Sequence, residues 1–169
     1  MSLEINVLNK SHDRKAFNCG ESELDNYLQN IARQHLDKGI AKTFVLIESK
    51  TPQSILGYMS LSACEILADE IPHHWKKKYP HKLPAMKLAR LAVDINQQKK
   101  GYGQLLMTDA IHKAVIVANN LGIVGLFVDA KHQKAKTFYQ QYGFIALPEQ
   151  LDNMFLPIKA INACLTEKE

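Results

Sequence analysis

The amino-acid sequence has 169 residues, a length that suits one domain with a substantial core and no need of metal or disulfide staples. Its formal charge is +4, its hydrophobic fraction 46% and its charged fraction 22%, values that are ordinary for a globular protein. No apolar run approaches the ~20 residues that span a bilayer, and the start, "MSLEINVLNK", lacks the pattern of a signal peptide. We expect a single cytoplasmic domain over residues 1–169.

The three cysteines, Cys19, Cys64 and Cys164, are far apart and outside any CxxC pattern, which favours reduced thiols over disulfides or a structural zinc site. The positive charge is uneven, because residues 73–82, "HHWKKKYPHK", carry four lysines and three histidines without an acid. This favours an anionic partner. The histidines of this stretch have no cysteine or paired carboxylate beside them, so we expect no metal site at His73, His74 or His81.

The first half of the chain reads as a strand, a helix and a hairpin. "EINVLN" alternates like a strand, and residues 20–39 have the apolar spacing of a helix that starts at Ser22 as N-cap, with Asp25 in a capping-box position, and stops at Gly39. "KTFVLIES" and "SILGYMSLSA", separated by "KTPQ", predict an antiparallel hairpin. The next segment, "CEILADEIP", fits a strand or a short helix.

The second half alternates strands and helices. Residues 73–84 predict an irregular loop, and 86–94, "MKLARLAVD", a strong strand. A glycine-containing loop then precedes a helix closed by Gly122, whose apolar face comprises Leu106, Ala110, Ala114, Val117 and Leu121. "IVGLFVDA" predicts a strand, "KHQKAKTFYQQYGF" a helix ending before Gly143, and "FIALPEQLDNMFLPI" two short strands. This order indicates an α/β layer architecture.

The loop "QQKKGYGQ" has the composition of an anion site. A helix N-terminus leaves backbone N–H groups without partners and carries partial positive charge, and glycine lets the backbone approach a ligand. The Walker A pattern and the Rossmann GxGxxG are both absent. The loop therefore predicts a phosphate or pyrophosphate site of another kind, the alternative being a simple turn that feeds a helix.

Here the sequence resembles the GNAT family of acyl-CoA-dependent N-acetyltransferases. The family signature, Q/R-x-x-G-x-G/A after a hydrophobic strand, is matched by Gln98, Gly101 and Gly103. In residues 4–158, the segments "FNCGESELDNYLQNIARQ", "KTFVLIE", "GYMSLSACEI", "LARLAVD", "VDAKHQKAKTFYQQYGF" and "MFLPI" follow the order found in GNAT toxins of bacterial toxin–antitoxin modules. The glycine loop alone is common to the whole GNAT family, whereas this ordered set of segments is much more specific to the toxins.

The resemblance implies a GNAT fold, a mixed central β-sheet of six to seven strands flanked by helices, with a splayed strand pair that holds acyl-CoA. It assigns acetyl-CoA binding to the strand backbone, the glycine loop and the later strand and helix: Leu91, Ala92, Val93, Gln98, Lys99, Lys100, Gly101, Tyr102, Gly103, Gln104, Asp129, Ala130, Ala135 and Phe138.

The resemblance also implies that Tyr139 is the catalytic acid that protonates the departing sulfur, since a phenol stays protonated at neutral pH. Spacing alone favours the alternative, a tyrosine packed in the core. The strand before the loop offers Arg90 and Asp94 but no glutamate as a general base, and Asp94 fits a capping role. A chain without a strong base suits an α-amine, whose pKa lies near ~7.7–8.0, better than a lysine near ~10.4.

Aminoacyl-tRNA is the acceptor that the toxin resemblance implies. The candidate tRNA contacts are basic: Lys76, Lys77, Lys78, Lys82, Lys87 and Arg90. Trp75 or Tyr79 is a candidate for stacking on an exposed base. A solvated loop face is the alternative for the lysines, and a structural ion pair is the alternative for Arg90.

The function that follows is a toxin that acetylates charged tRNA and blocks translation. The resemblance further implies a ribbon-helix-helix antitoxin, a complex with it that represses its own operon, and a homodimer. Two alternatives stay open: a GNAT enzyme acting on a small amine or a protein N-terminus, and a non-catalytic acyl-CoA- or RNA-binding module.

Overall fold

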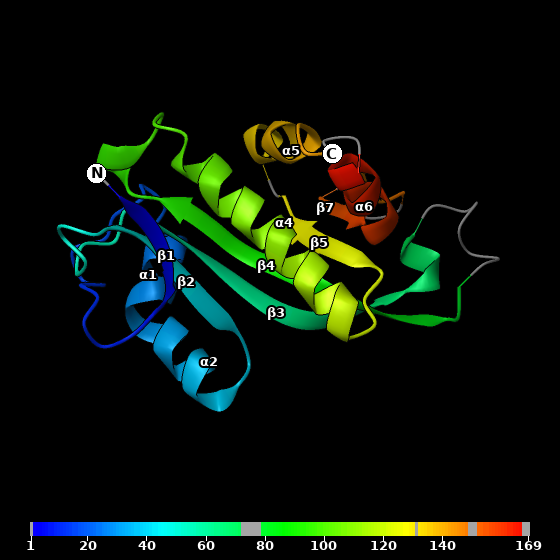
Figure 1. Cartoon of the computed structure of the whole chain (residues 1–169), viewed down its shortest axis with the longest axis horizontal. Helices are drawn as coiled ribbons and strands as arrows, with labels where there is room; N and C mark the ends of the chain where they lie inside the picture. The colour runs from blue at the N-terminus through cyan, green and yellow to red at the C-terminus, as the bar shows by residue number, and fades with distance from the viewer. Residues whose placement is uncertain (1, 72–78, 131, 149–151, 167–169) are drawn as a thin grey trace. The chain divides into compact units, whose positions relative to one another are not determined.

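The computed structural model describes residues 2–71, 79–130, 132–148 and 152–166. Its strands are β1 (Leu3–Val7), β2 (Lys42–Glu48), β3 (Gly57–Leu67), β4 (Lys82–Val93), β5 (Gly125–Asp129), β6 (Ile145–Ala146) and β7 (Asn153–Pro157). Its helical segments are α1 (Ser22–Asn26), the π-helix η1 (Tyr27–Ile31), α2 (Ala32–Lys38), the 3₁₀ turns η2 (Ala68–Glu70) and η3 (Ile95–Gln97), α4 (Tyr102–Asn120), α5 (Gln133–Gln140) and α6 (Ile158–Thr166). Figure 1 shows these elements in chain order.

In the described part of the chain the strands form one seven-stranded mixed sheet with the order β1-β2-β3-β4-β5-β7-β6. The pairing is antiparallel throughout β1–β2–β3 and β5–β7–β6, and β4 pairs with β5 in parallel. The helix α4 makes the crossover between these parallel strands, as a βαβ unit requires. The predicted α/β class and strand number are confirmed.

The ladder between β4 and β5 is short. Its register joins Met86–Leu88 to Leu126–Val128, although β4 continues to Val93. A splayed strand pair requires a ladder that stops before the strand does, and this register is consistent with that expectation.

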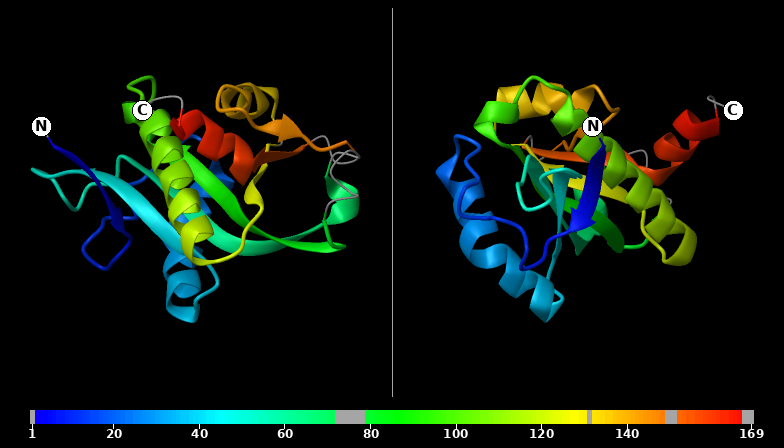
Figure 2. Two further views of the ribbon diagram at one scale, coloured as in Figure 1. Left: turned by 45° about the vertical axis from the view of Figure 1, so that its right-hand side comes forward. Right: turned by 60° about the vertical axis from the view of Figure 1, so that its left-hand side comes forward.

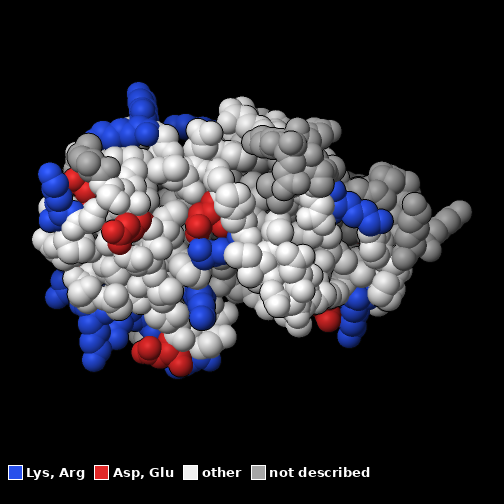
Figure 3. Space-filling model, viewed as in Figure 1, with Lys and Arg blue, Asp and Glu red and all other residues white. Residues whose placement is uncertain are grey.

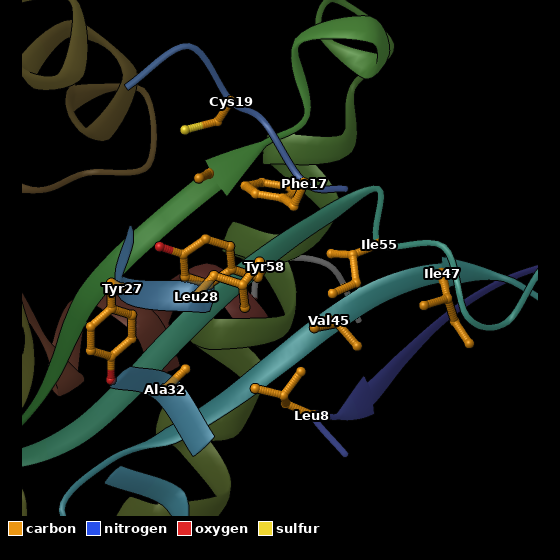
Figure 4. Close-up of a cluster of buried hydrophobic side chains, with 11 residues drawn as sticks. Leu8, Phe17, Cys19, Tyr27, Leu28, Ala32, Val45, Ile47, Ile55 and Tyr58 are labelled. Carbon is orange, nitrogen blue, oxygen red and sulfur yellow. The ribbon is translucent and has the colours of Figure 1, made fainter. Parts of the chain in front are cut away.

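The chain divides into two compact units. Unit 1 comprises residues 1–62 and 89–110. In it, α1, η1 and α2 lie on one face of β2 and the first part of β3 (Figure 2). Their buried side chains form a cluster with the strands: Leu8, Phe17, Cys19, Tyr27, Leu28, Ala32, Val45, Ile47, Ile55, Tyr58 and Ala92. Figure 4 shows most of these side chains.

Unit 2 comprises residues 63–88 and 111–169. Its core cluster is built from β3, β4, β5 and β7 together with the segments after η2 and β6: Ile66, Ile71, Leu83, Ala85, Phe127, Leu147 and Phe155. Four consecutive residues of β5, Gly125–Val128, are buried, so both faces of this strand are covered.

Most predicted elements are present, with different bounds. Ser22 is not the N-cap of the first helix: Glu21 occupies that position, and the Asp25 carboxylate accepts from the backbone N–H of Cys19 at 2.9 Å. The single predicted helix of residues 20–39 contains a π-turn, and Gly39 ends it with φ +71° as expected.

The segments around the basic stretch also differ. β3 continues through "CEIL" and is followed by the 3₁₀ turn η2, so both readings of that segment are partly right. β4 begins at Lys82, so the end of the predicted loop is strand instead. On α4, Leu106, Ala110 and Ala114 are fully buried, but Leu121 lies beyond the helix and is 66% exposed.

Candidate functional site

The predicted anion loop connects β4 to α4 in unit 1. Gly101 has φ +83°, which L side chains rarely adopt, and no heavy atom lies within 4 Å of a Cβ built on it. The first backbone bond into the helix runs from the N–H of Leu105 to the carbonyl of Gly101 at 3.1 Å. The N–H groups of Tyr102, Gly103 and Gln104 precede that bond, so the helix start offers donors to an anion.

Positive charge surrounds this helix start. Lys99 has φ +65°, the one non-glycine residue with positive φ in the described part of the chain, and Lys100 Nζ donates to Gln97 Oε1 at 2.9 Å. In Figure 3, lysine and arginine side chains gather over the loop that precedes α4. The geometry and charge of the loop therefore fit a diphosphate group.

Gln98, predicted to contact the cofactor, has its side chain committed within the protein. Its Nε2 donates to the carbonyls of both Cys19 and Val93, each at 3.1 Å. Asp94 accepts from the N–H of Asn96 at 3.0 Å and from that of Asn18 at 3.1 Å, which confirms its capping role. The Gln98 side chain therefore stabilises the shape of the loop. The candidate donors to an anion are the backbone N–H groups near Gly101.

The segment Phe17–Gly20, "FNCG", is therefore fastened to the candidate site, and we call it the FNCG strap. Besides the bonds of Gln98 and Asp94, the N–H of Ile95 donates to the carbonyl of Asn18 at 2.7 Å. The Cys19 side chain is buried, and this burial raises the pKa of its thiol to about 12. A thiol of that kind is structural and unreactive at neutral pH.

The strand that the family resemblance assigns to the pantetheine runs close to β3. A Cβ built on Gly57 would lie 2.9 Å from the carbonyl oxygen of Ala92 and 3.1 Å from Leu106 Cδ1. Tyr58, the next residue, is buried in the opposite face, in the core cluster of unit 1. The absence of a side chain at Gly57 thus lets β3 approach β4 closely at Leu91–Val93, the segment predicted to bind the pantetheine.

Tyr139 lies on α5 in unit 2 and is 8% exposed. Its ring contacts those of Phe138 at 5.4 Å and Phe144 at 5.5 Å between centroids. Burial, and secondly the negative charge of Asp129, raise the pKa of the Tyr139 phenol to about 12. The phenol therefore keeps its proton throughout the physiological range, as an acid or hydrogen-bond donor to sulfur requires.

The other predicted cofactor residues of unit 2 lie around the end of β5 and on α5. Asp129 is exposed, and Ala130 is fully buried with its N–H donating to the carbonyl of Asp152 at 2.6 Å. Ala135 and Phe138 are partly buried on α5. An ion pair of 3.0 Å between Lys136 and Asp152 holds the helix to the segment before β7.

Some of the candidate tRNA contacts lie among the described residues and some do not. Lys76, Lys77, Lys78 and Trp75 lie outside the described residues, as do His73 and His74. Lys82 is exposed at the start of β4, and Lys87 Nζ lies 6.0 Å from the centroid of Phe127. Tyr79 packs partly against the core cluster of unit 2. Arg90 lies over Tyr27, with its guanidinium carbon 3.6 Å from the ring centroid.

No helix among the described residues is long and apolar enough to cross a membrane. Within the same residues, no group of three or more His, Cys, Asp or Glu side chains is arranged to hold a metal ion.

Comparison with known proteins defines the class. Residues 39–146 match the family described as an acetyltransferase (GNAT) domain. The chain belongs to this GNAT acetyltransferase family.

Relatives that match nearly the whole length of the chain belong to a more specific group, the tRNA-acetylating toxins. The tRNA-acetylating toxin of Mycobacterium tuberculosis (strain ATCC 25618 / H37Rv) is 28% identical over 158 residues, covering 94% of this chain and 93% of the relative. AtaT complexed with acetyl-methionyl-tRNAfMet is 32% identical, covers 97% of this chain and 99% of its own, and superposes with a TM-score of 0.89. A Tyr-to-Phe mutant of AtaT bound to the C-terminus of the antitoxin AtaR and acetyl-CoA is 30% identical, covers 97% and 98%, and has a TM-score of 0.80.

Sequence reasoning missed the partners of the FNCG strap and the close approach at Gly57. The glycine was visible in "ILGYM", but its neighbour on another strand was not. The role of Asp25 was also misread, because a capping-box spacing does not reveal that the carboxylate is already bonded outside the helix.

Proposed function

We propose that this protein is an acetyl-CoA-dependent N-acetyltransferase that acetylates the α-amino group of aminoacyl-tRNA and acts as a toxin that blocks translation. The supporting observation is the fold correspondence, over nearly the whole chain, with AtaT complexed with acetyl-methionyl-tRNAfMet. We further propose that residues 1–169 act as one GNAT domain, since the family match extends through residues of both compact units.

Acetyl-CoA supplies the acetyl group as a thioester, whose sulfur must be stabilised when the group leaves. The backbone N–H groups at the start of α4, from Tyr102 to Gln104, bind the diphosphate, and Lys99 and Lys100 add positive charge. The backbone of Leu91–Val93 binds the pantetheine arm and polarises the acetyl carbonyl. The family resemblance further assigns Asp129, Ala130, Ala135 and Phe138 to acetyl-CoA binding.

Tyr139 holds a proton at its phenol oxygen for the sulfur. Because its pKa is raised to about 12, the phenol is protonated at neutral pH and can donate to the departing sulfur. The acceptor is an amine that is largely free near neutral pH, which an α-amine with a pKa near ~7.7–8.0 satisfies. An ordered water then suffices as the proton acceptor.

The basic side chains Lys82, Lys87 and Arg90, with Lys76, Lys77 and Lys78, bind phosphates of the tRNA. We also propose a homodimer in the cytoplasm and a ribbon-helix-helix antitoxin whose complex with the toxin represses their operon. The support is that a relative of the same fold binds the C-terminus of the antitoxin AtaR.

The test is incubation of the purified protein with labelled acetyl-CoA and total charged tRNA, followed by mass spectrometry of the aminoacyl adenosines after nuclease digestion. N-acetylated aminoacyl adenosine is expected. Acetylation of a polyamine or peptide panel with none of charged tRNA would overturn the proposal in favour of a small-amine enzyme. Tight acetyl-CoA binding without any transfer would favour the non-catalytic module.

A further inference from the structure

Arg90 is a partly buried cation that lies against an aromatic ring. Its guanidinium carbon lies 3.6 Å from the centroid of Tyr27, within the range of a cation–π contact. No hydrogen bond or ion pair joins Arg90 to another described residue, so the structural ion pair considered from the sequence is not found there. Its N–H donors are therefore available to a ligand.

The ring beneath Arg90 is fixed from several sides. Tyr27 is 1% exposed, and its hydroxyl lies 3.1 Å from His35 Nδ1 and 3.2 Å from Ser60 Oγ. Ser60 Oγ in turn accepts from Thr43 Oγ1 at 3.4 Å. The ring of Tyr58 stacks beside that of Tyr27 with centroids 6.5 Å apart and planes 19° apart (Figure 4). Burial in the core and packing beside Tyr58 thus hold the Tyr27 ring in place, and the hydrogen bonds of its hydroxyl add to this.

The backbone conformation at Tyr27 also helps to place its ring in the core. Tyr27 begins the π-helix η1, in which the N–H of Ala32 bonds to the Tyr27 carbonyl. The extra residue in this turn lets Tyr27 and Leu28 both enter the core, although they are neighbours in sequence. Single π-turns within helices are frequent at functional sites.

Arg90 is also next to the predicted acetyl-CoA strand. It precedes Leu91–Val93 on β4 and, at alternate spacing, shares a face with Ala92, which belongs to the same core cluster as Tyr27. The guanidinium is planar, and its fork of N–H donors matches two oxygens of a phosphate group. A ring 3.6 Å from its carbon restricts where those donors can lie. A Lys ammonium at this place would keep the charge but lose that geometry.

We propose that Tyr27 is a positioning residue for substrate binding: its fixed ring holds the Arg90 guanidinium flat so that Arg90 binds a backbone phosphate at the single-stranded 3′ end of the RNA substrate. This inference rests on the proposed function and deepens it. Phosphates of coenzyme A share the chemistry, and the experiment separates the two sources.

The experiment measures initial acetylation rates of charged tRNA, the Kd of acetyl-CoA by calorimetry and the Kd of uncharged tRNA against salt. The variants are Tyr27→Leu, Tyr27→Phe, Arg90→Met, Arg90→Lys and the double variant Tyr27→Leu/Arg90→Met. Tyr27→Phe keeps the ring and removes the hydroxyl, so it controls for the hydrogen-bond network.

Arg90→Met is expected to raise KM for charged tRNA about tenfold or more with kcat and the acetyl-CoA Kd unchanged, and to reduce the slope of log K against log salt by about 0.7. Tyr27→Leu raises KM by a similar factor while Arg90 is present and adds little in the double variant. Tyr27→Phe stays within about threefold of wild type, and Arg90→Lys keeps the salt slope but has an intermediate KM.

Additive effects of Tyr27→Leu and Arg90→Met on KM would overturn the positioning role. An unchanged KM and salt slope in Arg90→Met would also overturn the proposal. A loss of acetyl-CoA affinity in Arg90→Met, without a change in KM for tRNA, would overturn it too and would assign Arg90 to the cofactor. If wild type acetylates no charged tRNA, the proposed function fails; the Kd and salt slope of uncharged tRNA still decide whether Tyr27 and Arg90 act together on RNA. Melting temperatures of all variants show whether a variant has lost its fold.

Discussion

The side-chain amide of Gln98 donates to the backbone carbonyl of Cys19, 79 residues earlier in the chain, at 3.1 Å. The same nitrogen donates to the carbonyl of Val93, so one side chain joins the FNCG strap, the end of β4 and the anion loop. The signature glutamine of the loop thus holds three backbone segments in place, a role distinct from contact with a ligand.

Gln98→Ala is expected to weaken acetyl-CoA binding about tenfold and to lower the free energy of unfolding by about 1–2 kcal/mol, because two carbonyls lose their donor. Calorimetric titration with acetyl-CoA and urea unfolding measure these effects. Gln53→Ala, at an exposed turn, is the matched control and should change neither. An unchanged acetyl-CoA Kd in Gln98→Ala would show that the loop keeps its shape without this side chain.

Gly101→Ala is expected to cost about 1–2 kcal/mol of stability, since φ +83° is unfavourable for a residue with a Cβ although the space is open. It should also weaken acetyl-CoA binding at least tenfold, because the strained loop redirects the N–H groups at the start of α4. Gly39→Ala is a close control, with φ +71° and equally open space at the end of α2. It should cost similar stability with no effect on binding; equal losses of affinity in both variants would argue against the anion site.

Gly57→Ala is expected to disturb β4, because the new Cβ would lie 2.9 Å from the carbonyl oxygen of Ala92. Backbone must move to relieve that contact, so we expect a loss of about 1–3 kcal/mol and a weaker affinity for acetyl-CoA. Gly122→Ala, where nothing lies within 4 Å and φ is not positive, should be neutral in both assays. Full acetyl-CoA affinity in a folded Gly57→Ala variant would separate this strand from the cofactor.

Tyr139→Phe is expected to lower kcat about 10²–10³-fold with little change in the Kd of acetyl-CoA, because only the proton donor is removed. The ring, which packs against Phe138 and Phe144, is retained, so the melting temperature should stay close to that of wild type. Tyr142→Phe on the same segment serves as the control. A Tyr139→Phe variant with wild-type kcat would remove the phenol from the reaction.

The dependence of kcat/KM on pH should rise to a plateau above pH ~8, where an α-amine is deprotonated. No alkaline decline is expected up to pH ~9.5. The Tyr139 phenol has a pKa raised to about 12, and a raised pKa keeps the proton bound until the pH reaches it. Initial rates between pH 6 and 9.5 with freshly charged tRNA check the profile. A decline with an apparent pKa of ~8–9 would mean that another group supplies the proton.

Local patterns were sufficient for the hairpin of β2 and β3, the glycine-containing loop before α4 and the helix that carries Tyr139. Each depends on residues close in sequence, such as the alternation in "KTFVLIE" or the glycines at 101 and 103. The stack of Arg90 on Tyr27 and the bond between Gln98 and Cys19 join residues far apart, and nothing in their local sequence names the partner. The capping error at Ser22 has the same cause, because the Asp25 carboxylate is bonded outside the helix.

The FNCG strap lies upstream of residue 39, where the match to the GNAT family begins. A fragment trimmed to the boundaries of that match would keep every glycine of the loop. It would lose the main-chain carbonyl of Cys19, to which the Gln98 side chain donates a hydrogen bond. Such a minimal catalytic core should bind acetyl-CoA poorly, even where it folds, and adding residues 1–38 as a separate peptide is the direct way to ask whether the missing piece restores it.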